Sequence, residues 1–584
     1  VGPGRRSVAT RQPPRIVEGD FTKDDQPFNS IVAWSDLRDG MGLDVIANPA
    51  DVLRAWYIEG QRRRGHFVLP PLKTLTNNGV GGTPGANVEI LGELSNIIYA
   101  AIGANIYEYS NAADTWTIRV TAWTGEAAAS DAILVQMQDG VDYLVFAHDD
   151  SYERSSNGTT WTNDSKDVDY LAFWDDRLWG IDQAGQLWYS ITIGTEVNDA
   201  KLPVPDGWVK GLFVGPDASG GSIIYALTKV GLWAHDAANQ RFIQTGLVFP
   251  RHDDVGRPCV WRGSIYVPVG FSVFKYHPTD GSIIPVGPDL DDGVSNLRRG
   301  IISTLVSTFD ALIAVTKKGT PGVPSGYKNG VMAYNGWGWE FHALATLTAT
   351  DIFHAIASMS YSTYRLWWME TDRIHWMALH PDIFNPNEVT DEDYQAAGLL
   401  TYPWFTAGQS EVDKVAVEVR VEVRGASANE TVKVEYDTNY SGTFTTLGTI
   451  TANGITTYKF PNSTTPSGTA FRAIRFQVTL ARGATKTLTP DVLSVTLVYY
   501  KKMPTKWLFT FDLQLASHRQ KPVETLRANL ITAIEKSTGL VELVYREEDA
   551  TNTFYVNILD AQGIETPGPD VTAKNPVRVT AVEM

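Results

Sequence analysis

Cysteine is almost missing from this chain of 584 residues, in which Cys259 is the single example. One cysteine excludes an intrachain disulfide framework and any metal site built from several cysteines. Cys259 stands beside apolar residues in the phrase PCVW, so we expect it to be a small buried hydrophobic side chain. No apolar run approaches the ~18 residues needed to cross a bilayer, and no leader-like signal opens the chain. We therefore predict no membrane insertion.

Positive charge is also scarce. The 49 Lys and Arg residues face 66 Asp and Glu residues, which gives a formal net charge of −17. Nucleic acids and anionic membranes are bound through clustered cations, so this balance argues against a general binder of either. The compact basic stretches are RRRGH (62–66) and RR (298–299). We interpret both as ordinary surface or interface residues and predict no nucleic-acid partner.

Motifs for cofactors and nucleophiles are lacking as well. The sequence has no GxSxG elbow, no phosphate-binding glycine loop and no dinucleotide fingerprint, and GVGGTPG (79–85) reads as a flexible loop. The ten histidines show no HxxxH or HExxH pairing. Four of them lie in or beside the hairpins described below and are expected to be structural: His148, His235, His277 and His375. We predict no catalytic residue, no cofactor and no metal.

Carboxylates do occur in adjacent pairs, and two carboxylates can in principle form an acid/base pair. The pairs are Asp149-Asp150, Asp175-Asp176, Asp253-Asp254 and Asp291-Asp292. Aspartate is common in turns because its side chain accepts hydrogen bonds from nearby backbone N–H groups, and we favour that role here. The phrase DLDDG (289–293) resembles the start of a calcium loop but lacks the bidentate Glu at the required distance.

What the sequence has in abundance is a recurring aromatic hairpin. In DDRLWGIDQAGQLWYS (175–190), two apolar segments flank a polar turn that ends in Gly, a pattern that predicts a β-hairpin. The same pattern returns six more times. The seven units are 96–117, 142–162, 169–190, 222–242, 260–277, 309–340 and 364–380.

The spacing of these units indicates the fold. Anchors on one apolar residue of each unit are separated by 33 to 54 residues; they are Tyr99, Phe146, Trp179, Tyr225, Tyr266, Ile313 and Trp367. Short strands repeating every ~40–50 residues are typical of a β-propeller, in which blades stack radially to bury their faces. We predict about seven blades, with residues around 30–75 adding strands that close the ring. A β-sandwich or several small β domains is the competing interpretation.

Two further domains follow the predicted propeller. Valines at 415, 417, 419, 421 and 423 alternate with mostly polar residues, which predicts a strand with one buried face. Further alternating segments up to residue 500 predict an antiparallel β-sandwich. After it, KPVETLRANLITAIEKSTG (521–539) predicts a helix that packs on an antiparallel sheet. The predicted order is an extended arm (1–29), the propeller (30–405), the sandwich (406–500) and a small α+β module (501–584).

Several phrases resemble those of tailed-bacteriophage virion proteins. They are DRLWGIDQAGQLWYS (176–190), YNGWGWE (334–340), TPDVLSVTLVYY (489–500) and the order WLFTFDL…LRANL…GLVELVYRE…FYVNILD in the last 80 or so residues. The resemblance covers most of residues 95–584. It implies a non-enzymatic structural protein of the virion, located in the tail, tail tip or baseplate. It also implies multiple copies that contact other virion proteins, with the C-terminal module as the anchor.

Three other functional classes stay open. The propeller could bind a host-surface glycan, because Trp and Tyr are numerous. It could also be a sialidase-like glycoside hydrolase: SSNGTTW (155–161) is similar to the turn motif of such propellers but lacks one residue between Asn157 and Gly158. A sialidase further needs three converging arginines, a Tyr nucleophile and acidic partners. A secreted adhesin is a third possibility, which would require a signal sequence.

Overall fold

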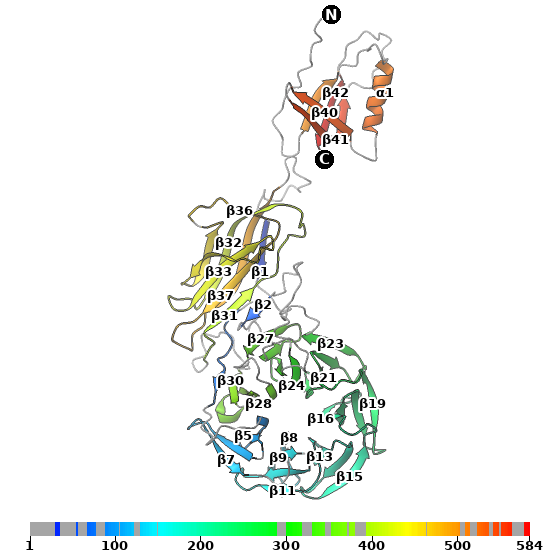
Figure 1. Ribbon diagram of the computed structural model, residues 1–584, viewed down its shortest axis with the longest axis vertical. Coiled ribbons are helices and arrows are strands. Elements are labelled where there is room, and N and C mark those ends of the chain that lie inside the picture. Colours follow the sequence, from blue (N-terminus) through cyan, green and yellow to red (C-terminus); the bar gives the residue numbers. More distant parts are fainter. Residues whose placement is uncertain are drawn as a thin grey trace, which may run out of the picture. The chain divides into compact units, whose positions relative to one another are not determined.

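The structure, a computed structural model, is almost entirely β (Figure 1). It describes residues 30–34, 54–56, 67–76, 88–103, 105–121, 129–148, 150–288, 300–317, 330–344, 352–370, 373–379, 393–462, 464–502, 508–513, 523–535, 541–547, 550–562 and 577–583. The predicted arm (1–29) lies outside these residues. The chain divides into two compact units, one formed by residues 30–500 and the other by 1–29 with 501–584.

Seven four-stranded antiparallel sheets form a β-propeller, as the sequence predicts, and Figure 1 shows them as a ring. Each of the seven predicted hairpin units falls in one blade. Blades one to three contain β4 (Val88–Leu94), β5 (Ile97–Ile102), β6 (Asn105–Ser110) and β7 (Thr115–Val120); β8 (Ala129–Gln136), β9 (Asp142–His148), β10 (Ser151–Ser155) and β11 (Thr162–Asp164); and β12 (Tyr170–Trp174), β13 (Arg177–Ile181), β14 (Gln186–Ser190) and β15 (Glu196–Lys201).

The remaining blades complete the ring. They contain β16 (Val209–Pro216), β17 (Ser222–Thr228), β18 (Gly231–Asp236) and β19 (Arg241–Val248); β20 (Cys259–Trp261), β21 (Ser264–Val269), β22 (Ser272–Tyr276) and β23 (Ile283–Pro288); β24 (Ile301–Ser307), β25 (Leu312–Lys317), β26 (Gly330–Tyr334) and β27 (Trp339–Leu344); and β28 (Ile352–Ser358), β29 (Arg365–Glu370), β30 (Arg373–Ala378) and β3 (Thr74–Leu75). A 3-10 turn (Ser360–Ser362) precedes β29.

Apolar clusters fill the spaces between neighbouring blades. Trp188, for example, is fully buried among residues of blades two and three, and Trp367 among residues of blades seven and one. Large aromatic side chains each bury 150–250 Å², which makes them the main source of blade-to-blade stabilisation. The aromatic richness of the repeats is thus largely explained by packing.

The ring is closed by a strand from the N-terminal side. β3 pairs with β30 as the outer strand of blade seven, with Thr74 opposite Trp376 and Leu75 opposite His375. This confirms the expectation that a segment before residue 75 closes the propeller. The next residue, Thr76, donates its hydroxyl to the carbonyl of Ile374 and accepts the indole N–H of Trp116 from blade one.

A buried ionic network fixes this closing strand. Lys73 forms an ion pair with the fully buried carboxylate of Glu370, whose other oxygen lies 3.3 Å from Nε2 of His375. The indole N–H of Trp368 also donates to Glu370, at 3.1 Å. Burial by itself would raise the pKa of Glu370, but His375 and Lys73 outweigh burial and hold that pKa well below its ordinary value. Glu370 is therefore ionised and fully partnered.

The β-sandwich consists of two antiparallel sheets. In the first, the order is β1 (Ser30–Trp34), β38 (Asp491–Lys501), β32 (Lys414–Arg424) and β35 (Gly454–Lys459), and β36 (Thr469–Phe471) pairs with β32. In the second, the order is β2 (Arg54–Trp56), β31 (Ala397–Thr401), β37 (Ile474–Ala481), β33 (Thr431–Thr438) and β34 (Thr445–Ile450).

Three strands that the sequence places within 30–405 belong to the sandwich instead. β1 pairs with β38, β2 pairs with β31, and β31 pairs with β37. The predicted start of the propeller at residue 30 and its end at 405 are corrected accordingly. The partners of β1 lie more than 450 residues away in the sequence, and local alternation carries no information about such distant pairing.

The predicted burial of the alternating valines in β32 is confirmed for only part of the strand. Val419, Val421 and Val423 are fully buried, whereas Val415 and Val417 are only partly buried. Lys414 and Ala416 take the buried side there, because the strand pairs with β36 over 414–416 and with β35 from 418 onward. The ammonium of Lys414 is satisfied by the carbonyls of Gln409 and Val412, both at 2.6 Å.

The small C-terminal unit has the predicted one-helix composition. Its sheet has the order β39 (Leu508–Leu513), β42 (Val577–Glu583), β41 (Ala550–Gln562) and β40 (Val541–Glu547), and its helix is α1 (Val523–Ile534). This helix lies within the segment 521–539 from which it is predicted. Among the described residues no helix is long and apolar enough to span a membrane.

Candidate binding site in the propeller channel

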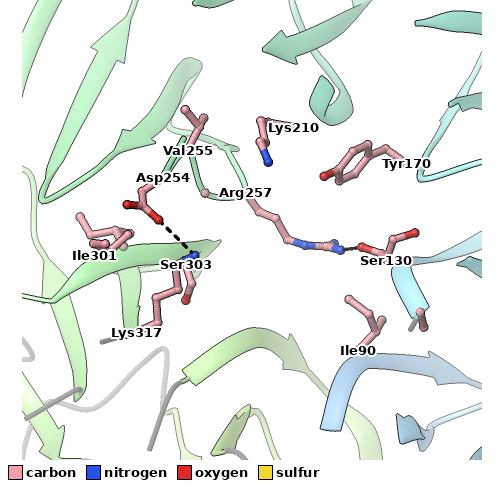
Figure 2. Close-up of a pocket in the computed structure, with 13 residues that line it drawn as sticks. Ile90, Ser130, Tyr170, Lys210, Asp254, Val255, Arg257, Ile301, Ser303 and Lys317 are labelled. Atoms are coloured by element: carbon pink, nitrogen blue, oxygen red, sulfur yellow. Dashed lines mark hydrogen bonds and ion pairs between the residues drawn. The ribbon is translucent and has the colours of Figure 1, made fainter. Parts of the chain in front are cut away.

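A cavity with a volume of about 330 Å³ lies at one end of the propeller's central channel (Figure 2). The first residues of several innermost strands converge on it, since every blade places its inner strand along the channel. Its lining consists of Ile90, Ala129, Ser130, Tyr170, Lys210, Asp254, Val255, Gly256, Arg257, Ile301, Ile302, Ser303 and Lys317. Residues from blades one to six therefore meet here.

Arg257 crosses the channel at the bottom of this cavity. One guanidinium N–H donates to Asp131 at 2.5 Å, and a second donates to the carbonyl of Ser130 in blade two. Asp131 is held in turn by the backbone N–H groups of Ala132 and Leu171, at 2.9 and 2.8 Å. Figure 2 shows the Arg257 side chain extended toward Ser130. Its orientation is thus fixed by contacts to blade two, where Asp131 is itself held by a backbone N–H of blade three.

A close backbone approach positions Arg257. The Arg257 N–H donates to the Ser303 carbonyl at 2.9 Å, and the Leu305 N–H donates to the Arg257 carbonyl at 3.1 Å, so this segment of blade five pairs with β24 of blade six. A Cβ on Gly256 would lie 2.3 Å from the Ile302 carbonyl oxygen. Only glycine fits this contact without displacement of the backbone.

A second channel cavity of about 350 Å³ lies along the same inner strands, and Arg257 and Tyr170 line both cavities, while Asp131 lines the second. Its wall includes Cys259 and His354. His354 is buried and accepts the Leu91 N–H at Nδ1, at 3.2 Å. Burial, with a smaller contribution from the charge of Arg257, holds the pKa of His354 well below its ordinary value, so the ring is neutral.

Cations dominate the mouth of the first cavity. Lys317 lies 3.5 Å from Asp254, and Lys229 lies 2.9 Å from Asp253. Lys210, which Figure 2 shows pointing into the cavity, has no ion-pair partner within 4.0 Å among the residues that the structure describes. Burial, followed by the charges of Lys229 and Lys317, lowers the pKa of Lys210 below its ordinary value.

Tyr170 forms the opposite wall. Burial raises the pKa of its phenol to about 12, so the hydroxyl stays protonated at neutral pH. The site therefore combines fixed cations, a phenol and the apolar side chains of Ile90, Val255 and Ile301. Such a lining can attract and orient an anion that carries a small organic body.

The adjacent aspartate pairs named in the sequence analysis lie in different structural settings. Asp175 and Asp176 occupy the β12–β13 turn with positive φ, as expected for turn residues. Asp253 and Asp254 are instead ion-paired to lysines at the channel mouth, so the turn interpretation is incomplete for them. Asp149, Asp291-Asp292 and the DLDDG phrase lie outside the described residues, as do both basic stretches.

Within the described residues, no group of three or more His, Cys, Asp or Glu side chains could hold a metal ion.

The four singled-out histidines contact neighbouring polar groups within the blades. His148 contacts the Ser151 hydroxyl, His277 contacts Ser264 at 3.0 Å, and His235 lies 2.7 Å from Asp199. His375 belongs to the closure network. Each of the four therefore has a polar neighbour, and their structural role stays a prediction. Cys259 is partly buried against the largest apolar cluster, and burial raises the pKa of its thiol.

The SSNGTTW segment is a structural turn. The Asn157 side chain accepts the N–H groups of Thr159 and Thr160, and Trp161 packs against Tyr99 and Phe146. A sialidase-like site would need three converging arginines. Arg257 is the one arginine among the described residues that line either channel cavity.

Sequence reasoning did not identify Lys210, Arg257 or Lys317 as site residues. They lie in three different blades, far apart in sequence, and no local motif marks them. A usable signal was the position of Lys210 and Tyr170 at the starts of innermost strands, where a propeller channel is lined.

No protein-family model matches the sequence, and no curated protein is similar to it. Solved structures with similar folds include the extracellular domain of a protein described as a hybrid two component system from B. thetaiotaomicron (14% identity, TM-score 0.41, covering 69% of this chain). This chain spans 47% of that protein. Another is virginiamycin B lyase from Staphylococcus aureus, with 9% identity and a TM-score of 0.38; the match covers 53% of this chain and 99% of the lyase. A third is the Neurospora crassa Pan2 WD40 domain, with 8% identity and a TM-score of 0.38; the match covers 56% of this chain and 98% of that domain. At these values, no functional argument rests on them.

Proposed function

We propose that the chain is a non-enzymatic structural component of a phage virion, located in the tail and present in several copies. The observation that carries the proposal is the division of the chain. Residues 30–500 form one compact unit with a closed propeller, while the small C-terminal module belongs to another unit. A rigid presenting body with a separate small module suits a repeated assembly part.

The module has a surface suited to association. On β41 the buried Val556 alternates with Tyr555, which is 58% exposed, and Leu559 is 57% exposed. Val544 of β40, whose cross-strand partner is Thr553, is 45% exposed. Exposed apolar side chains on one sheet favour contact with another protein surface. We propose that this module joins copies of the chain to each other and to other virion proteins.

Light scattering on the purified chain tests this role. We expect a discrete multimer, with a mass that is a multiple of 64.3 kDa. The double substitution Tyr555→Ser and Leu559→Ser should reduce the multimer to monomers, because it removes the apolar contact. The matched control Trp337→Ser, an exposed aromatic residue on the propeller (70% exposed), should leave the mass unchanged.

A glycan-binding protein is the second candidate, favoured by two exposed aromatic residues in blade six. Phe309 (66% exposed) and Trp337 lie in adjacent turns, which Arg262 joins by donating to the carbonyls of Asp310 and Asn335. Aromatic faces stack on sugar rings. A chain that remains monomeric and binds surface polysaccharide, with binding lost in Trp337→Ser, would favour this function over assembly.

A further inference from the structure

The charge of the channel mouth is opposite to that of the whole protein. The chain carries a formal net charge of −17, yet the first channel cavity is lined by three cations and one carboxylate. The cations are Lys210, Arg257 and Lys317, and the carboxylate is Asp254. Because like charges in a partly enclosed space repel one another, this arrangement opposes folding unless it has a counter-ion.

The ion pairs leave one cation of this cavity unmatched. Arg257 is neutralised by Asp131, and Lys317 by Asp254. Lys229, just outside the lining, is neutralised by Asp253. Lys210 has no such partner within 4.0 Å among the described residues, and the like charges of Lys229 and Lys317 act on it more strongly than the opposite charges of Asp253 and Asp254. A bound anion would supply the missing negative charge.

The remaining lining sets the class of ligand. A volume of about 330 Å³ is at the small end of ligand pockets and admits a molecule of monosaccharide size. Ile90, Val255 and Ile301 offer apolar contact, while the protonated phenol of Tyr170 offers a hydrogen-bond donor. These groups suit a small organic body attached to an anionic group.

We infer that the channel mouth binds a small carboxylate- or phosphate-bearing molecule, with Lys210 as its main cationic contact. Lys317 and Arg257 shape the electrostatic field, and Arg257 forms the floor of the site. The ammonium of Lys210 accounts for attraction to either oxyanion, since both are strong acceptors of charge-assisted hydrogen bonds. This inference does not depend on the proposed role in a virion.

Calorimetric titration of the full chain tests the inference, with glucuronate as the carboxylate, glucose 6-phosphate as the phosphate and glucose as the neutral control. We expect at least one anionic sugar to bind and glucose not to bind. The relative affinities of the two anionic sugars identify which oxyanion the site prefers. Binding should weaken when NaCl rises from about 50 mM to about 500 mM, because salt screens the attraction.

The substitution Lys210→Met should lower the affinity by about tenfold or more, since it removes a charge-assisted contact. The matched control Lys201→Met, at an exposed lysine of β15, should bind like the unmodified chain. Thermal unfolding verifies that Lys210→Met is folded. Failure of both anionic sugars to bind at about 10 mM, equal binding of glucose, or unchanged affinity in folded Lys210→Met would each overturn the inference.

Discussion

Replacing Glu370 by Gln should lower the free energy of unfolding by about 3–5 kcal/mol, the typical effect of breaking a buried ion pair. The substitution removes the negative charge that faces the largely buried ammonium of Lys73 beside the closing strand. The side chain keeps its size, so lost packing contributes little. Because β3 contributes only two residues to blade seven, we expect ring closure to depend strongly on this network. Chemical denaturation monitored by tryptophan fluorescence measures the effect.

The double variant Lys73→Met with Glu370→Gln separates lost charge pairing from damage to the fold. If the loss comes from a Lys73 ammonium that no longer faces the Glu370 carboxylate, removing that ammonium should recover at least about 1 kcal/mol relative to Glu370→Gln alone. A double variant less stable than Glu370→Gln alone would contradict this explanation.

Acid should reduce the difference between the unmodified chain and Glu370→Gln. The pKa of Glu370 is lowered in the folded state, so its stabilising contribution is fully present above the ordinary glutamate pKa of about 4.3. The contribution is lost as pH falls through the lowered folded-state value. We therefore expect the stability difference between the two chains to be constant near neutral pH and to shrink below about pH 4. A difference that grows in acid would contradict the assignment of an ionised Glu370.

The second large effect is expected in the sandwich. Trp34→Ala should cost about 3–5 kcal/mol, because truncation of a buried tryptophan loses its burial and leaves a cavity. Trp34 is 1% exposed, and its ring lies within 6 Å of the rings of Tyr402, Phe405 and Phe476. The loss should also loosen β1, the strand that brings the chain into the sandwich before it reaches the propeller. Denaturant titration measures the loss.

The matched comparison is Trp337→Ala, which removes an exposed tryptophan and should change stability by no more than about 0.5 kcal/mol. Equal losses in the two variants would show that β1 does not pack as described. Protection of the β1 amides from hydrogen exchange gives an independent check, because their ladder with β38 should be lost in Trp34→Ala.

The blades could be predicted because their signal is local. In the hairpin of blade three, β13 and β14 flank a turn in which Asp182 accepts the Gln186 N–H at 2.8 Å and Gly185 has a φ of +80°. Every part of that pattern lies within 16 consecutive residues, and an antiparallel strand pair recurs at the corresponding place in all seven blades. Local alternation also indicated half of the described strands of the sandwich, namely β32, β33, β35, β37 and β38.

The pairing of distant strands could not be predicted in the same way. β1 alternates like many short strands, and nothing within it specifies β38 as its partner. The sequence predicted that a segment near residue 75 closes the ring. It could not predict that Lys73 pairs with the buried Glu370, which lies almost 300 residues away. Such contacts become visible only when the chain is folded.

The channel site escaped prediction for a related reason. Lys210, Arg257 and Lys317 are unremarkable in their local sequence, and each belongs to a different blade. Asp254 resembled a turn residue, because aspartate is common in turns. Only the convergence of inner strands brings these charges together.

Labelling of purified phage particles with an antibody against this chain tests the proposed function most directly. The particles should come from a phage that encodes the chain and should be viewed by electron microscopy. We expect label at the tail, in a repeated pattern around its axis. Particles without label, in a culture where the same antibody detects the free chain, would contradict a structural role in the virion.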